Sequence, residues 1–219
     1  MQPPRSNVVI REYQPRDRAA VHRLTHATAL MGEPCGVFFD GDEVFAQAVS
    51  GYFTDYEPES CFVAVDGDQV VGYLTGAQDA RRVNAVFNRR IAFPLFIRAL
   101  AAGVLCKKKN LVFLARFLVS LFKGELTMPV QDRDYPAVMH LNVETAYRGS
   151  GIGRRLTDAF CAYLRRHDVK GVSLATMSGR TGQFFARQGF QLLFTGKRSY
   201  LRHVLHKDVP IYIYGKRLE

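Results

Sequence analysis

An apolar strand that runs directly into a glycine-rich turn and an amphipathic helix is the feature that most constrains this chain. The strand covers residues 135–143, three glycines follow at 149, 151 and 153, and the helix is expected over about 151–167. Glycine accepts positive φ angles and lets the backbone approach a ligand closely. The unpaired N–H groups and positive dipole of a helix N-terminus attract phosphate. This unit is therefore predicted to bind a pyrophosphate.

The spacing of the turn narrows the class of ligand. Gly-x-Gly-x-Gly differs from the Gly-x-Gly-x-x-Gly of dinucleotide-binding folds, and the absence of a following Gly-Lys-Ser or Gly-Lys-Thr excludes the phosphate loop of NTPases. The turn does match Arg/Gln-x-x-Gly-x-Gly/Ala, through Arg148, Gly151 and Gly153. On this motif the chain resembles the GNAT superfamily of acyl-CoA-dependent N-acyltransferases. The alternative is an ordinary glycine-rich turn of an α/β protein.

The order of predicted elements agrees with that resemblance. A strand over 8–13 and a helix from Asp17 precede a β-hairpin over 61–74 whose turn is Asp66-Gly67. One or two short helices with mobile connections are expected over 31–59. Strands are expected at 171–176, 189–194 and 209–214, with a short helix over 182–188. This pattern predicts an α/β fold with a mixed sheet and helices on both faces.

Two further segments resemble the family. The hairpin is similar to its second and third strands, and Phe184-Phe185-Ala-Arg-Gln-Gly189-Phe190 is similar to its Phe-Tyr-x-x-x-Gly-Phe signature. The resemblance covers 7–80 and 134–219, and it implies a single GNAT domain over 1–219 with a helical insertion at about 81–130, between the third and fourth strands. Tyr56-Glu-Pro-Glu-Ser-Cys-Phe-Val-Ala and Tyr135-Pro-Ala-x-x-His140 also resemble a bacterial branch related to the acetyltransferase-like domain of O-GlcNAc hydrolases.

The resemblance implies where acetyl-CoA, the acyl donor, would bind. In the family the pantetheine lies along the fourth strand, which puts it on backbone groups of Leu141 and Val143. A backbone N–H aimed at the thioester oxygen would stabilise the tetrahedral oxyanion. The pyrophosphate would bind the backbone of the turn, near the Arg148 side chain; the turn residues concerned are Gly149, Ser150, Gly151, Ile152, Gly153 and Arg154.

An amine acceptor must lose a proton, and the same strand offers two candidate bases. His140, Asn142 and Glu144 alternate along it and so share one face. His140 has an unperturbed pKa suited to the task, and Glu144 ends the strand beside the glycine turn. Either residue is a candidate, directly or through water. The alternative is that Glu144 caps the turn and His140 fills a polar position in the sheet.

The general acid departs from the family pattern. Phe185 stands where the family often uses a Tyr to protonate the leaving thiolate, and Ser178 stands where an Asn is usual. Tyr135, Tyr212, Tyr214 or water would have to replace that acid, whose loss lowers a rate by about 10²–10⁴-fold. The expected function is transfer of acetyl from acetyl-CoA to a primary amine. The alternative is a non-catalytic CoA-binding or membrane-associated interaction protein on the same fold.

Charge is concentrated in the expected insertion. Residues 81–128 carry ten basic side chains and one acidic one, interleaved with the apolar runs 91–97 and 111–115. These runs are shorter than the ~20 residues that span a bilayer, which favours basic amphipathic helices. Such helices pack on the domain's own sheet, wall a pocket for an acyl chain or lipid-like acceptor, form a homodimer, or contact a membrane surface through 84–126. Nucleic acid is not an expected partner, because no recognition signature accompanies the charge.

Cysteine and histidine usage bears on compartment and metals. The four cysteines, at 35, 61, 106 and 161, have no Cys-x-x-Cys spacing and are expected to be buried free thiols. No apolar signal segment is found at the N-terminus, so a cytoplasmic location is expected. The six histidines are scattered without zinc-like pairing, and no metal site is predicted.

Overall fold

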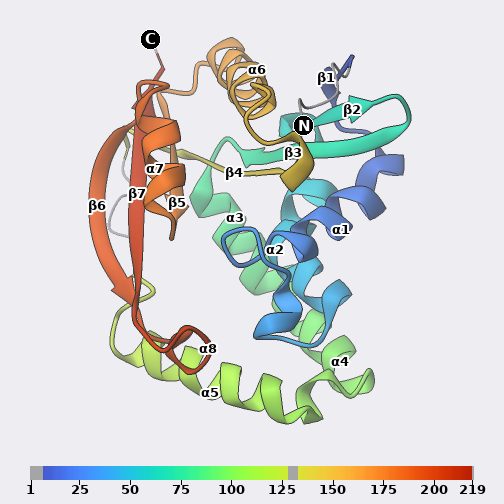
Figure 1. The fold of residues 1–219 in the computed structure, drawn as a ribbon, viewed down its shortest axis with the longest axis vertical. Helices are drawn as coiled ribbons and strands as arrows, with labels where there is room; N and C mark the ends of the chain where they lie inside the picture. The colour runs from blue at the N-terminus through green and yellow to red at the C-terminus, as the bar shows by residue number, and fades with distance from the viewer. Residues whose placement is uncertain (1–6, 128–132, 219) are drawn as a thin grey trace.

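A seven-stranded mixed sheet forms the centre of the computed structural model, which describes residues 7–127 and 133–218 (Figure 1). Its strand order is β1-β2-β3-β4-β5-β7-β6, and only the β4–β5 pair is parallel. The mixed sheet predicted from the sequence is thus confirmed. The strands are β1 (Val9–Glu12), β2 (Phe62–Asp66), β3 (Gln69–Ala77), β4 (Ala137–Val143), β5 (Gly171–Thr176), β6 (Gln191–Arg198) and β7 (Val209–Arg217).

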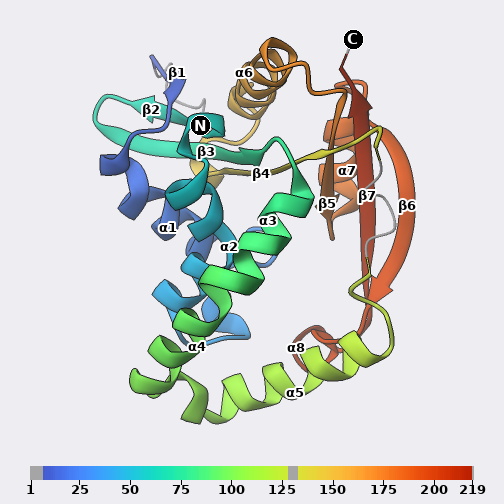
Figure 2. The same ribbon diagram turned by 180° about the vertical axis from the view of Figure 1, so that it is seen from behind.

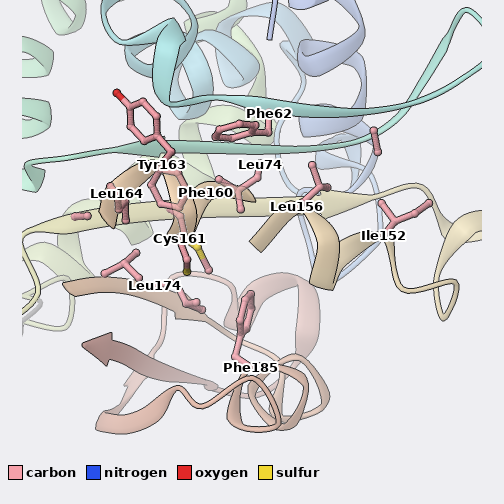
Figure 3. Close-up of a cluster of buried hydrophobic side chains, with 14 of the residues drawn as sticks. Phe62, Leu74, Ile152, Leu156, Phe160, Cys161, Tyr163, Leu164, Leu174 and Phe185 are labelled. Atoms are coloured by element: carbon pink, nitrogen blue, oxygen red, sulfur yellow. The ribbon is translucent and has the colours of Figure 1, made fainter. Parts of the chain in front are cut away.

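Helices cover both faces of the sheet. One face is packed by α1 (Arg18–Ala27) and α2 (Asp42–Tyr56), through a buried cluster that includes Val21, Phe53 and Tyr73. The opposite face is packed by α6 (Ile152–Arg166) and α7 (Gly179–Ala186). Figure 3 shows how α6 inserts its apolar stripe between β2–β3 and the β5–α7 region; the labelled stripe residues include Leu156, Phe160 and Leu164.

The segment 31–59 differs from its prediction. In place of one or two short helices with mobile connections, it contains the 15-residue helix α2. Acidic Asp42 and Glu43 occupy the first turn, where they complement the helix dipole. Gly51 suggested a break in the sequence, but it lies inside the helix, where the Gln47 side chain covers it. Tertiary packing of this face outweighs the low helix propensity of glycine.

Three helices occupy the expected insertion between β3 and β4. They are α3 (Ala80–Val86), joined to the next helix through a π-helical turn over Phe87–Ile91, α4 (Ala92–Ala101) and α5 (Lys108–Phe122). Residues 128–130, the end of the predicted insertion, lie outside the described residues. In Figures 1 and 2, α4 and α5 lie at the opposite end of the molecule from α6, and α5 extends beneath α8 (Arg202–Leu205).

The inner face of α5 is buried against two parts of the chain that are far apart in sequence. Phe113 packs against Phe38, with ring centroids 5.2 Å apart, and against Tyr200 at 5.9 Å. Asn110 accepts a hydrogen bond from the Asp40 N–H at 2.7 Å and donates to the Asp40 carbonyl at 2.9 Å. The insertion therefore packs on its own domain, which is one of the alternatives predicted from the sequence. Besides the inner face of α5, Ile91, Ala99 and Val104 are buried there.

All four cysteines are free. Cys35, Cys61 and Cys161 are buried, as expected, whereas Cys106 is exposed. Cys106 ends the short 3-10 turn Val104–Cys106 between α4 and α5. The prediction of a buried thiol is wrong for this residue because the turn buries Val104 instead.

Candidate functional site

The parallel strands β4 and β5 separate soon after they meet. Their pairing comprises Ala137 with Val172 and Val138 with Ser173, whereas β4 continues to Val143. On its other side β4 stays paired with β3 as far as Val143. Residues 139–143 therefore present one backbone edge to an opening in the sheet, where an extended ligand can add as a strand does.

The backbone direction of each residue at this edge follows from one hydrogen bond. The Glu144 N–H donates to the Val71 carbonyl on β3 at 2.9 Å. Backbone groups of an antiparallel pair alternate between facing the partner and facing away. Asn142 and His140 therefore direct their backbone N–H and carbonyl groups to β3. Leu141 and Val143 direct these groups to the opening. These last two are the residues to which the resemblance assigned the pantetheine.

The glycine turn lies beyond the C-terminal end of β4 and has the backbone geometry of an anion site. Gly149 and Gly151 have φ angles of 85° and 83°, and a Cβ built on either meets nothing within 4 Å. Gly151 is the N-cap of α6, and the first bond of that helix runs from the Arg155 N–H to the Gly151 carbonyl at 3.1 Å. The N–H groups of Ile152, Gly153 and Arg154 precede this first bond of the helix. No side chain among the described residues caps them.

The arginines at the turn have different roles. The exposed Arg148 donates from Nε to the Val143 carbonyl at 3.1 Å. Arg154 is 75% exposed, and its Nε lies 3.7 Å from the Asp158 carboxylate. Arg155 turns away to donate to the Val8 carbonyl at 2.9 Å. Arg148 and Arg154 are therefore the two arginines that remain available to an anion at the turn.

A cavity of ≈ 340 Å³ lies on the α1–α2 side of the sheet, where β4 and β5 part. His140 and Ser173 contribute polar groups to its wall from the two strands. The insertion contributes through α3 and through Leu126, so it helps to shape this cavity. The lining residues are Phe53, Ala80, Val83, Asn84, Leu126, Val138, His140, Ser173, Leu174, Ala175 and Ile213.

His140 is held in a desolvated position on this wall. Its ring packs edge-on against Phe53, with centroids 5.4 Å apart. Burial lowers the pKa of His140 below its ordinary value of 6.5, because desolvation disfavours the imidazolium. The ring is therefore neutral at pH 7, the form in which an imidazole accepts a proton. Next along the same face, Asn142 donates to the Tyr73 hydroxyl at 2.7 Å, which bonds Thr25 at 2.7 Å.

Glu144 lies outside the cavity. Its carboxylate is 3.7 Å from Arg23 and 3.4 Å from the Gln69 amide, and its side chain is 31% exposed. Glu144 follows His140 by four positions along the extended chain, which corresponds to about 13 Å. The two candidate bases therefore do not serve the same reacting atom, and only His140 faces the cavity.

The family model for the acetyltransferase (GNAT) family matches residues 28–190, which is well over half of the chain. The chain belongs to this family. No match was found among the curated proteins.

Solved structures with the GNAT fold resemble the chain over nearly its whole length. "SsHAT" has a TM-score of 0.67 at 22% identity, over 97% of this chain and 98% of that one. A Drosophila melanogaster polyamine N-acetyltransferase that forms N-acetylagmatine has a TM-score of 0.63 at 16% identity, over 97% and 100%. The acetyl-CoA-bound acetyltransferase yncA of Salmonella typhimurium has a TM-score of 0.59 at 12% identity, over 97% and 94%. The predicted fold and the predicted superfamily are thus confirmed.

The position of the family's usual acid is occupied by a buried ring in this GNAT protein. Phe185 is 3% exposed, with ring centroids 5.0 Å from Phe184 and 5.3 Å from Phe190. Ser178, where the family usually has Asn, caps α7 by accepting from the Thr181 N–H at 3.3 Å. Neither side chain is arranged to protonate a thiolate.

The three tyrosines considered as substitutes lie in different places. The ring of Tyr135 packs against Gly171 at the start of β5, and the Tyr214 hydroxyl lies against Gly182 of α7. Tyr212 pairs in register with Thr176, the last residue of β5. Because β4 and β5 diverge toward their C-terminal ends, Tyr212 lies beside the wide end of the opening.

A group of three metal-ligating residue types lies elsewhere, although no zinc-like spacing is found in the sequence. His26, Cys35 and Asp42 bring their ligand atoms within 4.8 Å of one another, and His26 Nε2 is 3.0 Å from the Asp42 carboxylate. Burial and neighbouring carboxylates raise the pKa of the Cys35 thiol to about 12. His26 and Asp42 line a separate surface hollow of ≈ 580 Å³ that has no lining residue from β4 or β5.

The insertion residues that line the cavity were not identified from the sequence. Ala80, Val83 and Leu126 are ordinary apolar residues, and nothing in their spacing marks them as ligand-facing. Only the fold brings the two ends of the insertion back to the strand that carries His140. Ser173 was missed for a similar reason, since it lies in a strand that the sequence pattern predicts to be wholly buried.

Proposed function

We propose that the protein transfers acetyl from acetyl-CoA to the primary amine of a small acceptor, with His140 as the base. One observation carries the proposal. The opening between β4 and β5 has a helix N-terminus suited to phosphate at one end and, at the other, a cavity that contains a neutral imidazole.

The donor would follow the open edge of β4. Its pyrophosphate would bind the backbone from Gly149 to Arg154 with Arg148 alongside, and its pantetheine would bond to Leu141 and Val143. This path leads the thioester away from the glycine turn and toward His140. Glu144 lies at the pyrophosphate end of the same strand, so we assign it a role in orienting Arg23 rather than in catalysis.

The chemistry would proceed by direct attack. The amine nitrogen forms a bond to the thioester carbonyl carbon while His140 receives the proton that the nitrogen loses. A backbone N–H at the β4 edge stabilises the oxyanion of the tetrahedral intermediate. The C–S bond then breaks, and the CoA thiolate takes a proton from water or from Tyr212. Positioning of amine against thioester supplies much of the rate enhancement.

The cavity indicates the kind of amine. Among its lining residues that the structure describes, none is a carboxylate, and most side chains are apolar. The Drosophila enzyme acts on polyamines and forms N-acetylagmatine, which carry further cationic groups. An apolar cavity binds a monoamine with an aliphatic or aromatic body better than a polycation, because an unpaired buried charge is costly.

Thiol release with a panel of amines tests the function. Phenethylamine and hexylamine are expected to release CoA thiol faster than agmatine or spermidine, each supplied with acetyl-CoA. His140→Gln is expected to lower kcat by about 10²–10⁴-fold with unchanged acetyl-CoA affinity. Glu144→Gln is the matched control on the same strand face, and its kcat should stay within a few-fold of the wild-type value.

A second function is favoured by Phe185. Because this buried ring replaces the family's usual acid, the fold would also suit a protein that binds acetyl-CoA without turning it over. Calorimetric binding of acetyl-CoA with no thiol release from any amine would establish that alternative. Equal activity of His140→Gln and wild type would instead remove His140 from the mechanism.

We also infer a cytoplasmic location. Four free cysteines, with Cys106 exposed, suit a reducing compartment. Cell fractionation of the tagged protein would test this, and recovery of an oxidised, secreted form would contradict it.

A further inference from the structure

The insertion carries an exposed apolar surface that the acetyl-transfer site does not use. Fourteen large apolar residues among those described are exposed, and ten of them lie between 93 and 122. We call this surface the α4–α5 rim. Its ten residues are Phe93, Phe96, Ile97, Leu100, Leu111, Val112, Leu118, Val119, Leu121 and Phe122.

Helix α5 is apolar on both of its faces. The inner face buries Asn110 and Ser120 and packs Phe113 against the domain, whereas the outer face exposes Leu118 at 51% and Phe122 at 87%. A helix that is apolar all round is normally buried on all sides. Exposed apolar patches of this kind mark interaction sites, so the outer face of α5 requires a partner.

Helix α4 extends the same surface. Phe93 is 69% exposed and Phe96 is 53% exposed, while Ile91 and Ala99 are buried. Both helices lie at the end of the molecule farthest from α6 (Figures 1 and 2). The helices that carry the rim residues thus lie together at this end of the molecule, away from the glycine turn.

Basic side chains are interleaved with this surface. The segment 81–128 has ten basic residues against one acidic residue. Within the part of the chain that the structure describes, ion pairs with carboxylates involve only Arg98, which is 3.9 Å from Glu43, and Lys109, which is 2.7 Å from Asp40. The other eight basic residues of the segment are exposed: Arg81, Arg82, Arg89, Arg90, Lys107, Lys108, Arg116 and Lys123.

We propose that the α4–α5 rim docks on an anionic membrane surface, with its apolar side chains in the interface and its cations on lipid phosphates and carboxylates. Amphipathic helices with basic polar margins bind in this way, and each basic residue near the surface strengthens binding about fivefold. No helix within the described residues is both long and apolar enough to cross the bilayer.

Charge argues for lipid over a second copy of the chain. A two-fold interface places the same patch of both copies in contact, which would bring two sets of uncompensated cations together. Like charges brought close together destabilise an interface. An anionic bilayer instead neutralises them, and it accepts the apolar side chains without requiring a shaped groove.

Vesicle flotation of the full-length protein tests the docking. Vesicles of pure phosphatidylcholine are compared with vesicles containing 30 mol% phosphatidylserine (about a third anionic, a composition that gives a strong surface potential), at low and at high salt. Binding is expected only to the anionic vesicles and should weaken at high salt because ions screen the surface charge. No binding to anionic vesicles, or equal salt-insensitive binding to both kinds, would refute the proposal.

The apolar contribution is tested with Phe93→Ser plus Phe122→Ser. Both rings are largely exposed, so the fold should survive, as a melting curve checks. At least tenfold more anionic lipid should be needed for half-maximal binding. Leu192→Ser is the matched control, because Leu192 is 51% exposed on β6, away from the rim, and it should bind as the wild type does.

The basic contribution is tested with Lys107→Glu, Lys108→Glu and Arg116→Glu combined. About a 100-fold loss of affinity is expected from three such sites. The control reverses two exposed cations near the α6 end of the molecule, Arg166→Glu and Lys170→Glu. An equal loss in the control would mean that only overall charge matters, which would overturn the assignment to the rim.

The oligomeric state in solution tests the remaining alternative, in which a second copy of the chain covers the rim. A dimer that dissociates when Phe93 and Phe122 are replaced, together with no flotation, would make the rim a contact between two copies and would refute membrane docking. A monomer that floats with anionic lipid supports it. Acetyl-CoA binding should be unchanged in all rim variants, so this outcome is separate from the test of catalysis.

Discussion

Gly151 gives the sharpest test of the predicted acetyl-CoA site, because stability and binding can be separated there. The residue has a φ of 83°, and a Cβ added to it meets nothing within 4 Å. Gly151→Ala therefore causes no clash inside the protein. Its energetic effect on folding is confined to placing an L-residue in the left-handed region, which costs about 1–2 kcal/mol.

The effect on binding should be larger than the effect on folding. The new methyl group would occupy the space beside the free N–H groups of α6, where the pyrophosphate is expected. Loss of even one charge-assisted hydrogen bond is worth about 1.5–3 kcal/mol, which corresponds to about a 10–150-fold weaker Kd for acetyl-CoA. In a chain of this size the folding effect lowers Tm by about 2–8 °C.

Calorimetric titration with acetyl-CoA and a melting curve measure the two effects. Gly67→Ala is the matched control, because Gly67 has a φ of 58°, its added Cβ also meets nothing within 4 Å, and it lies in the β2–β3 turn. The control should lose similar stability and no affinity. If Gly151→Ala binds acetyl-CoA as tightly as Gly67→Ala does, the pyrophosphate is not bound at this turn.

Three further predictions follow from particular contacts. Because burial lowers the pKa of His140, the ratio of kcat/KM for wild type to that for His140→Gln should stay constant from pH 8 down to 6.5 and fall only below it, since the ratio removes the titration of the amine itself. The same shift stabilises the fold above pH 6.5, and this stability is lost as pH falls through the lower folded-state pKa. A midpoint of the ratio above pH 7 would contradict the lowered pKa. Phe185→Tyr should speed thiol release by up to about 100-fold with unchanged acetyl-CoA affinity, and an unchanged rate would mean that water or another tyrosine already protonates the thiolate. Asn110→Ala removes bonds of 2.7 and 2.9 Å to Asp40 and one of 2.7 Å to Val104, so it should lower the unfolding free energy by about 2–4 kcal/mol in urea titration, whereas Asn88→Ala on the exposed π-helical turn should change it little.

Local signals in the sequence were sufficient to predict the strands and the glycine turn before α6. The β5 strand begins and ends at its predicted residues, and α6 differs from its prediction by one residue at each end. Both elements have a strong hydrophobic pattern, and a glycine lies at the start of each. The length of α2 was not predicted, because one or two short helices were expected over 31–59 and no local pattern shows the packing that accommodates Gly51 inside a single helix.

The candidate site was only partly predictable for a related reason. The assignments to Leu141 and Val143 came from the resemblance to the family, whereas strand alternation placed His140, Asn142 and Glu144 on one face. The choice between His140 and Glu144 depended on which side chain faces a cavity, and that cavity is closed by Ala80, Val83 and Leu126 from a distant segment. No local pattern encodes such a juxtaposition.

Helix α5 affects how far the opening between β4 and β5 can change its width. At one end its inner face contacts Asp40 and Phe38, which precede α2, the helix packed on β3. At the other end it contacts Ser199 and Tyr200, which follow β6. Within the sheet the two halves pair only through two residues each of β4 and β5, and α6 packs against both halves, so α5 adds a further connection at a distance from that pairing. Connections at separate places restrict the rotation of one half-sheet relative to the other more than a single connection does. The width of the opening is therefore set without a ligand, and a ligand that binds there does not have to order it at a cost in entropy.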